Sequence, residues 1–214
     1  MSDQEMNNQQ RAIEILQRLQ PLYGSSPCPL NYENPLQLLL AVIMAAQCTD
    51  DRVNQVTAEL FRRYSDVTAI AKANLSELET ILQPLSFYRN KAKYIQNTCQ
   101  ILIDRFNGEV PQKIEELVKL PGVARKTATM VLHYAYQIDA GITVDTHVKR
   151  LSDRLGLSKQ SDLEKIEKDL IAILPESEWG NCFVNLTYHG RMVCTAKKPD
   201  CLNCVIADLC PSSM

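Results

Sequence analysis

The nine residues Leu120–Ala128 constrain the fold more than any other part of the chain. They run Leu-Pro-Gly-Val-Ala-Arg-Lys-Thr-Ala and separate two stretches with helical patterning, Pro111–Lys119 before them and Thr129–Tyr136 after them. Proline and glycine together end one helix and allow a tight turn before the next. The segment therefore predicts two helices joined by a short hairpin, with Gly122 at the turn.

Such a hairpin has the chemistry of a phosphate site. Gly122 carries no Cβ, so the backbone can approach a ligand closely, and the free amides that open the second helix point outward at its positive end. Lys126 falls in the first turn of that helix beside Arg125, where the helix dipole and the neighbouring cation favour a nucleophilic, uncharged amine. The alternative is a solvated lysine that only adds charge.

The rest of the chain also predicts helices and no sheet. Only seven of the 214 residues are glycine, and alternating apolar runs are few. The first helix is expected over Gln10–Leu19, ended by Pro21, and a buried helix is expected to open at Asn34 and Pro35. These patterns predict an all-α fold. Two Ser-x-x-Glu sequences predict further helix starts, at Ser76–Glu79 and Ser161–Glu164.

The charge balance limits how the protein can bind nucleic acid. A net charge of -2 and an isoelectric point near 6.0 exclude a uniformly basic surface, but they leave room for a basic groove on one face. The first ten residues are mostly polar, and the longest apolar run, Leu38–Ala46, is too short to cross a bilayer. We expect a cytoplasmic protein whose eight cysteines do not form disulfides.

Two loops carry side chains that have both a functional and a structural interpretation. Gln47 follows the first buried helix and would place an amide at the mouth of a groove; the alternative is a plain helix end, with Thr49 and Asp50 capping the next helix. Phe87 lies in a second loop, where an aromatic ring either wedges between base pairs or anchors the loop to the core. Arg89–Lys93 adds three positive charges after it.

Asp145 lies in the sequence Val144-Asp145-Thr146-His147, just before residues with helical spacing. That position predicts an N-cap, which needs no other partner. A carboxylate held there can also act as a base for an amine nucleophile or stabilise a positively charged, sugar-like transition state. From the residues alone both roles remain open.

The C-terminal cysteines have the spacing Cys-x6-Cys-x2-Cys-x5-Cys and are followed by Pro211. This pattern predicts a metal centre, either an iron–sulfur cluster or a structural zinc ion, although zinc sites commonly use two close cysteine pairs. Lys197 and Lys198 lie in the first spacer, where they would face a phosphate backbone. The remaining cysteines are expected in the core: Cys28, Cys48, Cys99 and Cys182. The predicted ligands are Cys194, Cys201, Cys204 and Cys210.

Three motifs occur together and in order: the hairpin sequence, Val144–His147 and the cysteine tail. This combination resembles the endonuclease III family of DNA repair glycosylases. Ala46–Asp50, Tyr88–Ala92 and Tyr188–Arg191 are also in register, so the similarity extends over nearly the whole chain. The resemblance implies a 4Fe-4S cluster on the cysteine tail. It also implies two all-α domains around a DNA groove: a six-helix barrel over residues 25–138, and a cluster domain of residues 1–24 and 139–214.

The resemblance further implies a bifunctional base-excision repair enzyme that acts as a monomer on double-stranded DNA. A damaged pyrimidine is flipped into a pocket, and Lys126 attacks C1′ of its sugar with assistance from Asp145. The resulting Schiff base undergoes β-elimination, which cuts the abasic strand. Localisation with the bacterial nucleoid is the corresponding expectation.

Residue by residue, the resemblance implies that Gln47 fills the gap left by the flipped nucleotide and that Phe87 stands where the family commonly has a leucine wedge. Ala124 replaces the second glycine of the usual hairpin motif; alanine tolerates positive φ poorly, so the turn must keep φ negative there or carry strain. The DNA contacts implied in the hairpin and the second domain are Gly122, Val123, Ala124, Arg125 and His147.

Three other functions are compatible with parts of the sequence. A monofunctional glycosylase would release bases without incision by Lys126. A noncatalytic DNA-binding module would use the hairpin and the cluster only as structure. An iron–sulfur electron carrier would leave the lysine and the aspartate unexplained.

Overall fold

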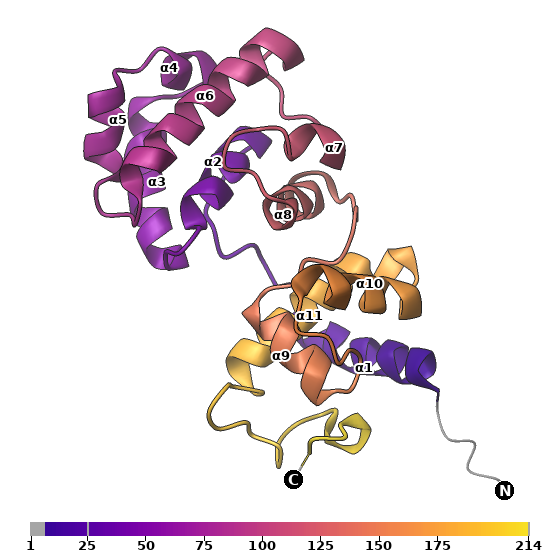
Figure 1. The fold of residues 1–214 in the computed structure, drawn as a ribbon. Helices are drawn as coiled ribbons and strands as arrows, with labels where there is room; N and C mark the ends of the chain where they lie inside the picture. The colour runs from indigo at the N-terminus through magenta and orange to yellow at the C-terminus, as the bar shows by residue number, and fades with distance from the viewer. Residues whose placement is uncertain (1–6, 25, 214) are drawn as a thin grey trace, which may run out of the picture. The chain divides into compact units, whose positions relative to one another are not determined.

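The computed structural model describes residues 7–24 and 26–213, and within them it contains helices and no strand (Figure 1). The chain divides into two compact units. One is the continuous segment Cys28–Ile138, and the other combines the chain up to Pro27 with everything from Asp139 onward. The predicted all-α, two-domain fold is confirmed. Among the described residues, none of the helices is long and apolar enough to cross a membrane.

The Cys28–Ile138 unit is built around one apolar helix, α2 (Pro35–Ala45), in which every residue of Leu38–Met44 is buried. Asn34 caps this helix by accepting a hydrogen bond from the Gln37 amide at 3.0 Å, and Pro35 holds the first helical position, as predicted. The helices α3, α6 and α8 pack against α2. The bounds are α3 (Asp50–Arg63), α4 (Val67–Ala71), α5 (Leu75–Leu82), α6 (Tyr88–Phe106), α7 (Ile114–Leu117) and α8 (Arg125–Tyr136).

The second unit is built around α11 (Trp179–Met192), against which α1 (Asn8–Tyr23) and α9 (Thr146–Arg154) both pack. Gly190 allows the close approach of α9, because a Cβ at this position would lie 2.9 Å from the Cβ of His147. The remaining helix is α10 (Leu163–Ile173), and two short 3-10 turns are η1 (Glu176–Glu178) and η2 (Ala207–Leu209).

Two predicted helices have the wrong length. Pro21 does not end the first helix: α1 continues to Tyr23, and the Gly24 amide donates to the Gln20 carbonyl at 2.8 Å. A proline this close to the end of a helix removes only one backbone hydrogen bond, so the last turn survives. The helix expected over Pro111–Lys119 shortens to α7, because Lys113 keeps an extended backbone and the chain turns after Leu117.

Both predicted Ser-x-x-Glu capping boxes are also wrong. Helix α5 is capped by Asn74, whose side-chain oxygen accepts from the amide and the hydroxyl of Ser76 at 2.9 and 2.8 Å. Helix α10 is capped by Asp162, which accepts from the Lys165 amide at 3.1 Å. In each case an Asn or Asp within two residues of the serine takes the cap, and both residue types are favoured there.

Candidate functional site

The hairpin between α7 and α8 depends on Gly122. Its φ of +76° lies in the left-handed region, and a Cβ here would lie 2.8 Å from Cδ2 of Tyr94 and 3.2 Å from Cγ2 of Ile43. The Thr98 hydroxyl fixes the turn by donating to the Pro121 carbonyl at 3.2 Å. The turn therefore requires glycine both for its backbone conformation and for its close packing on α6 and α2.

Ala124, which replaces the second glycine of the usual hairpin motif, does not have a positive φ. It is the N-cap of α8 with φ -84° and ψ 169°, an extended conformation that alanine adopts without strain. Because alanine has no side-chain acceptor, the helix opens without a side-chain capping hydrogen bond. Lys126 lies in the first turn of α8, as predicted, and its side chain is exposed, whereas the side chain of Val123 is buried. Only the backbone of Val123 is therefore available to a ligand.

Asp145 is the N-cap of α9, which confirms the first of its two predicted roles. Its Oδ1 accepts from the amides of His147 and Val148, both at 2.8 Å. Its Oδ2 accepts from the hydroxyl of Thr187 on α11 at 3.4 Å. The half-buried carboxylate thus has one oxygen committed to the helix and a second oxygen held by a single long bond. Asp145 and Lys126 belong to different units, so their joint action remains a prediction.

Gln47 and Phe87 share an unusual backbone. Both have φ +57° although neither is glycine, and both side chains are exposed, Phe87 to 63%. Gln47 follows α2, and Phe87 directly precedes α6 without any side-chain cap. Thr49 caps α3 by accepting from the Arg52 amide at 3.4 Å. The anchor interpretation of Phe87 is wrong, since its ring is not in the core.

The three charges of Arg89–Lys93 do not form one exposed basic cluster, because Lys91 is only 4% exposed. Its Nζ donates to the Ala46 carbonyl at 2.8 Å and to the Cys48 sulfur at 3.2 Å. Burial alone would raise the pKa of the Cys48 thiol, but its hydrogen bonds to Lys91 and Ser86 and the lysine charge lower that pKa below its ordinary value. Sequence reasoning missed this pair, because an amphipathic helix usually exposes its lysines.

The four C-terminal cysteines line one cavity, whose other walls include Leu151, Val193 and Ile206. No three Cys, His, Asp or Glu side chains in the described part of the chain are arranged to hold one metal ion. Four Cys thiolates are the usual ligand set of an iron–sulfur cluster. The donor set and its spacing therefore fit an iron–sulfur cluster.

Two side chains donate hydrogen bonds toward the cluster thiols. Arg154 Nη1 lies 3.1 Å from the Cys194 sulfur and donates to the Thr195 carbonyl at 2.8 Å. His189 Nε2 lies 3.4 Å from the Cys204 sulfur, and burial lowers the pKa of this histidine to about 4, so its ring is neutral. With the cluster bound, the Cys204 thiolate would accept a hydrogen bond from Nε2, and Nδ1 would then accept from the Tyr23 hydroxyl, 3.4 Å away.

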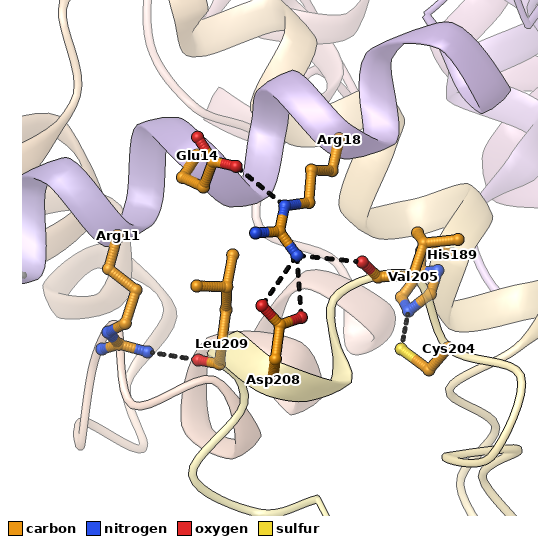
Figure 2. A network of polar contacts seen from close by, with 8 residues as sticks. All are labelled: Arg11, Glu14, Arg18, His189, Cys204, Val205, Asp208 and Leu209. Carbon is orange, nitrogen blue, oxygen red and sulfur yellow. Dashed lines mark hydrogen bonds and ion pairs between the residues drawn. The ribbon is translucent and has the colours of Figure 1, made fainter.

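Helix α1 holds the end of the cysteine segment in place (Figure 2). Arg18 bonds both oxygens of Asp208, at 2.7 and 2.9 Å, and is itself positioned by Glu14 at 2.8 Å. Arg11 donates to the Leu209 carbonyl at 3.2 Å. These arginines occur more than 180 residues before their partners, so local sequence patterns could not have revealed them.

The remaining predicted contacts are accessible to different degrees. Lys197 and Lys198 are both exposed, in the loop between the first two cysteines. His147 is half-buried, and its Nδ1 lies 3.2 Å from Nη2 of Arg150. Arg150 also donates to the Cys194 carbonyl at 3.0 Å. Sequence analysis did not assign a role to this arginine.

Comparison with known proteins places the chain in a family. The model of the HhH-GPD superfamily of base excision DNA repair proteins matches residues 40–176. The model of the iron-sulfur binding domain of endonuclease III matches residues 194–210, which begin and end at the outer two cysteines. The predicted cofactor, a 4Fe-4S cluster, is confirmed.

Individual relatives match over almost their whole length. Endonuclease III of Synechocystis sp. is 53% identical over 97% of this chain and 94% of its own. Endonuclease III of Escherichia coli is 37% identical over 95% of this chain and 96% of its own. A solved structure of a trapped covalent intermediate between endonuclease III and DNA is 40% identical, covers 97% of this chain and 98% of its own, and has a TM-score of 0.89. The chain therefore belongs to the endonuclease III family of base-excision repair enzymes, which are DNA glycosylases and abasic-site lyases.

Proposed function

We propose that the chain removes oxidised pyrimidines from double-stranded DNA and then cuts the abasic strand, with Lys126 as the nucleophile. The damaged nucleotide leaves the base stack, and Nζ of Lys126 attacks C1′ as the bond to the base breaks. Loss of a proton from C2′ and of the 3′ phosphate from the resulting Schiff base is β-elimination. One observation supports this proposal most directly. Lys126 is exposed in the first turn of α8, directly after the tight turn at Gly122.

Asp145 has the complementary role. Positive charge develops on the sugar as the base departs, and a fixed carboxylate stabilises it or accepts the proton of the attacking amine. The two amides that bond Oδ1 orient the group, while Oδ2 accepts a long hydrogen bond from the Thr187 hydroxyl. The N-cap and the chemical role are therefore compatible in one side chain.

The DNA-binding surface includes the hairpin and the exposed loops. The uncapped amides at the start of α8, with Arg125, suit a phosphate, and the small residues Gly122 and Ala124 leave the backbone accessible. Gln47 and Phe87 present exposed side chains that suit the space left by the flipped nucleotide. His147, Lys197 and Lys198 supply further contacts to the DNA backbone.

Cys194, Cys201, Cys204 and Cys210 would hold the cluster. When bound, the cluster cross-links a segment that has little regular secondary structure, and so fixes the loop that carries Lys197 and Lys198. We further propose that the protein acts as a monomer, in the cytoplasm and at the nucleoid, since its substrate is chromosomal DNA with damaged pyrimidines or abasic sites.

The test is borohydride trapping of the cluster-loaded protein on a duplex with one thymine glycol. Wild type should give a covalent adduct and Lys126→Gln none, with DNA binding largely retained, because the substitution removes the nucleophile and at most one phosphate contact. Lys119→Gln is the matched control: it removes the same charge from an exposed position before the turn, and it should still be trapped. Base release without any trapped adduct in wild type would instead indicate a monofunctional glycosylase.

A further inference from the structure

Lys91 is a buried lysine whose hydrogen-bond partners, Ala46 and Cys48, lie on either side of Gln47 in the sequence. The residue is only 4% exposed, and its Nζ donates to the Ala46 carbonyl at 2.8 Å and the Cys48 sulfur at 3.2 Å. Burying a charge is unfavourable unless hydrogen bonds compensate it, so these contacts are strongly held. The residue between the two partners is Gln47.

The same lysine lies in the first turn of α6, the helix that directly follows Phe87, the second proposed DNA contact. The Lys91 amide donates to the Phe87 carbonyl at 3.1 Å. The backbone and side chain of Ser86 also hydrogen-bond the Cys48 sulfur. Residues 46–49 and 84–87, called here the insertion loops, are thus joined through Lys91 and Cys48.

A third contact ties residues 84–87 to α3, the helix that follows residues 46–49, because Arg52 on α3 donates to the Pro84 carbonyl at 3.4 Å. Gln47 and Phe87 need this support, because a left-handed backbone is unfavourable for residues with a Cβ. Such a conformation persists only when surrounding contacts fix it. A direct phosphate contact by Lys91 is ruled out by its burial and by the direction of its hydrogen bonds.

We propose that Lys91 is a positioning residue that, through Ala46 and Cys48, preorganises the insertion loops so that Gln47 and Phe87 can replace a flipped nucleotide in duplex DNA. The inference rests on the proposed function of these two residues. Preorganisation lowers the ordering cost of binding and keeps the inserted groups in a productive geometry. Lys91 acts through the loops and never touches the reacting sugar.

The experiment measures borohydride trapping of cluster-loaded proteins on two substrates, a duplex with one abasic site and the same abasic strand alone. Only the duplex requires a gap to be filled. Lys91→Met should reduce duplex trapping about tenfold or more while single-strand trapping stays within about twofold of wild type. Lys93→Met removes the same charge from an exposed position on α6 and should leave the ratio of the two rates unchanged.

A second readout follows insertion itself. With 2-aminopurine opposite the abasic site, wild type and Lys93→Met should give the same fluorescence change on binding, and Lys91→Met a smaller one at saturating protein. A merely structural role of Lys91 would lower the two trapping rates together and leave this amplitude unchanged, and that result would overturn the proposal. Wild type that traps neither substrate would instead refute the proposed function.

Cysteine variants decide the question if Lys91→Met does not fold. Cys48→Val removes one acceptor of Lys91 while keeping the lysine, and Cys48→Ser keeps an acceptor in the same place. The valine variant should lose about threefold of the duplex-specific rate and the serine variant should match wild type. Equal ratios in both variants would overturn the proposal.

Discussion

The two units support their functional loops in different ways. In the Cys28–Ile138 unit, short turns between helices place Gln47, Phe87 and Gly122 in left-handed backbone conformations, and packing and one buried lysine hold them. In the other unit, the cysteine segment is largely irregular, and arginines from α1 and α9 donate to its carbonyls. Short turns need a particular φ, whereas a long irregular segment needs side-chain donors for its backbone.

The largest test of this difference is Arg154→Met. The change removes the hydrogen bonds to the Cys194 sulfur and to the Thr195 and Ala196 carbonyls, so we expect a loss of about 3 kcal/mol in unfolding free energy. Thermal melting measures this loss, and fading of the cluster absorbance under a chelator should accelerate. Arg18→Met is the control, since its ion pair with Asp208 is solvent-screened and should contribute much less. Equal effects of the two substitutions would break the comparison.

A second test separates structure from chemistry in the same unit. Asp145→Asn keeps an oxygen that can accept from His147 and Val148, so the unfolding free energy should change by about 0.5 kcal/mol or less. Base release on a thymine glycol duplex should fall about 100-fold, because the charge is lost. Asp162→Asn alters the cap of α10 in the same way and should leave base release unchanged. If both variants retain wild-type rates, Asp145 is only a cap.

A third test addresses the hairpin, whose stability we expect to depend on the left-handed backbone conformation of Gly122. Gly122→Ala places a Cβ 2.8 Å from the Tyr94 ring at a positive φ, and we expect a destabilisation of about 2 kcal/mol by thermal or chemical unfolding. Ala124→Gly should be close to neutral, since this N-cap is already extended and glycine is tolerated there. A Gly122 variant as stable as wild type would show that the turn does not depend on its left-handed residue.

The sequence predicted the features that depend on local chemistry. The hairpin, the caps at Asn34 and Asp145, and a metal centre on the C-terminal cysteines follow from short patterns whose physical cause lies within a few residues. The errors made from the sequence are also local. At the two serine caps a nearby Asn or Asp took the cap instead, and Pro21 lies so near the end of α1 that it does not stop the helix. Patterns within one turn of a helix are thus informative, although not always decisive.

The features that sequence analysis missed all depend on contacts between distant residues. Lys91 looks like any helix lysine until the Ala46 carbonyl and the Cys48 sulfur are brought to it. Arg154 and His189 gain their roles only when the cysteine segment folds against α9 and α11. Such roles are set by tertiary packing, which has no periodicity in the sequence.

The smallest predicted effect concerns a thiol. Lys91 and Ser86 lower the pKa of Cys48, whereas burial raises that of Cys28 to about 11 and those of Cys99 and Cys182 to about 12. A lower pKa means a larger thiolate fraction below the ordinary thiol range, so iodoacetamide should alkylate Cys48 first among these four near neutral pH.

In Lys91→Met the donor and the cation are lost, so the Cys48 pKa should rise and its pH–rate curve should shift to higher pH, converging with wild type only where both thiols are ionised. Mass spectrometry of the Cys48 peptide measures the curve, with Lys93→Met as the control. An unshifted curve would mean that Lys91 does not act on Cys48 in solution. The insertion loops would then be held by their backbone turns and packing, without support from a buried lysine.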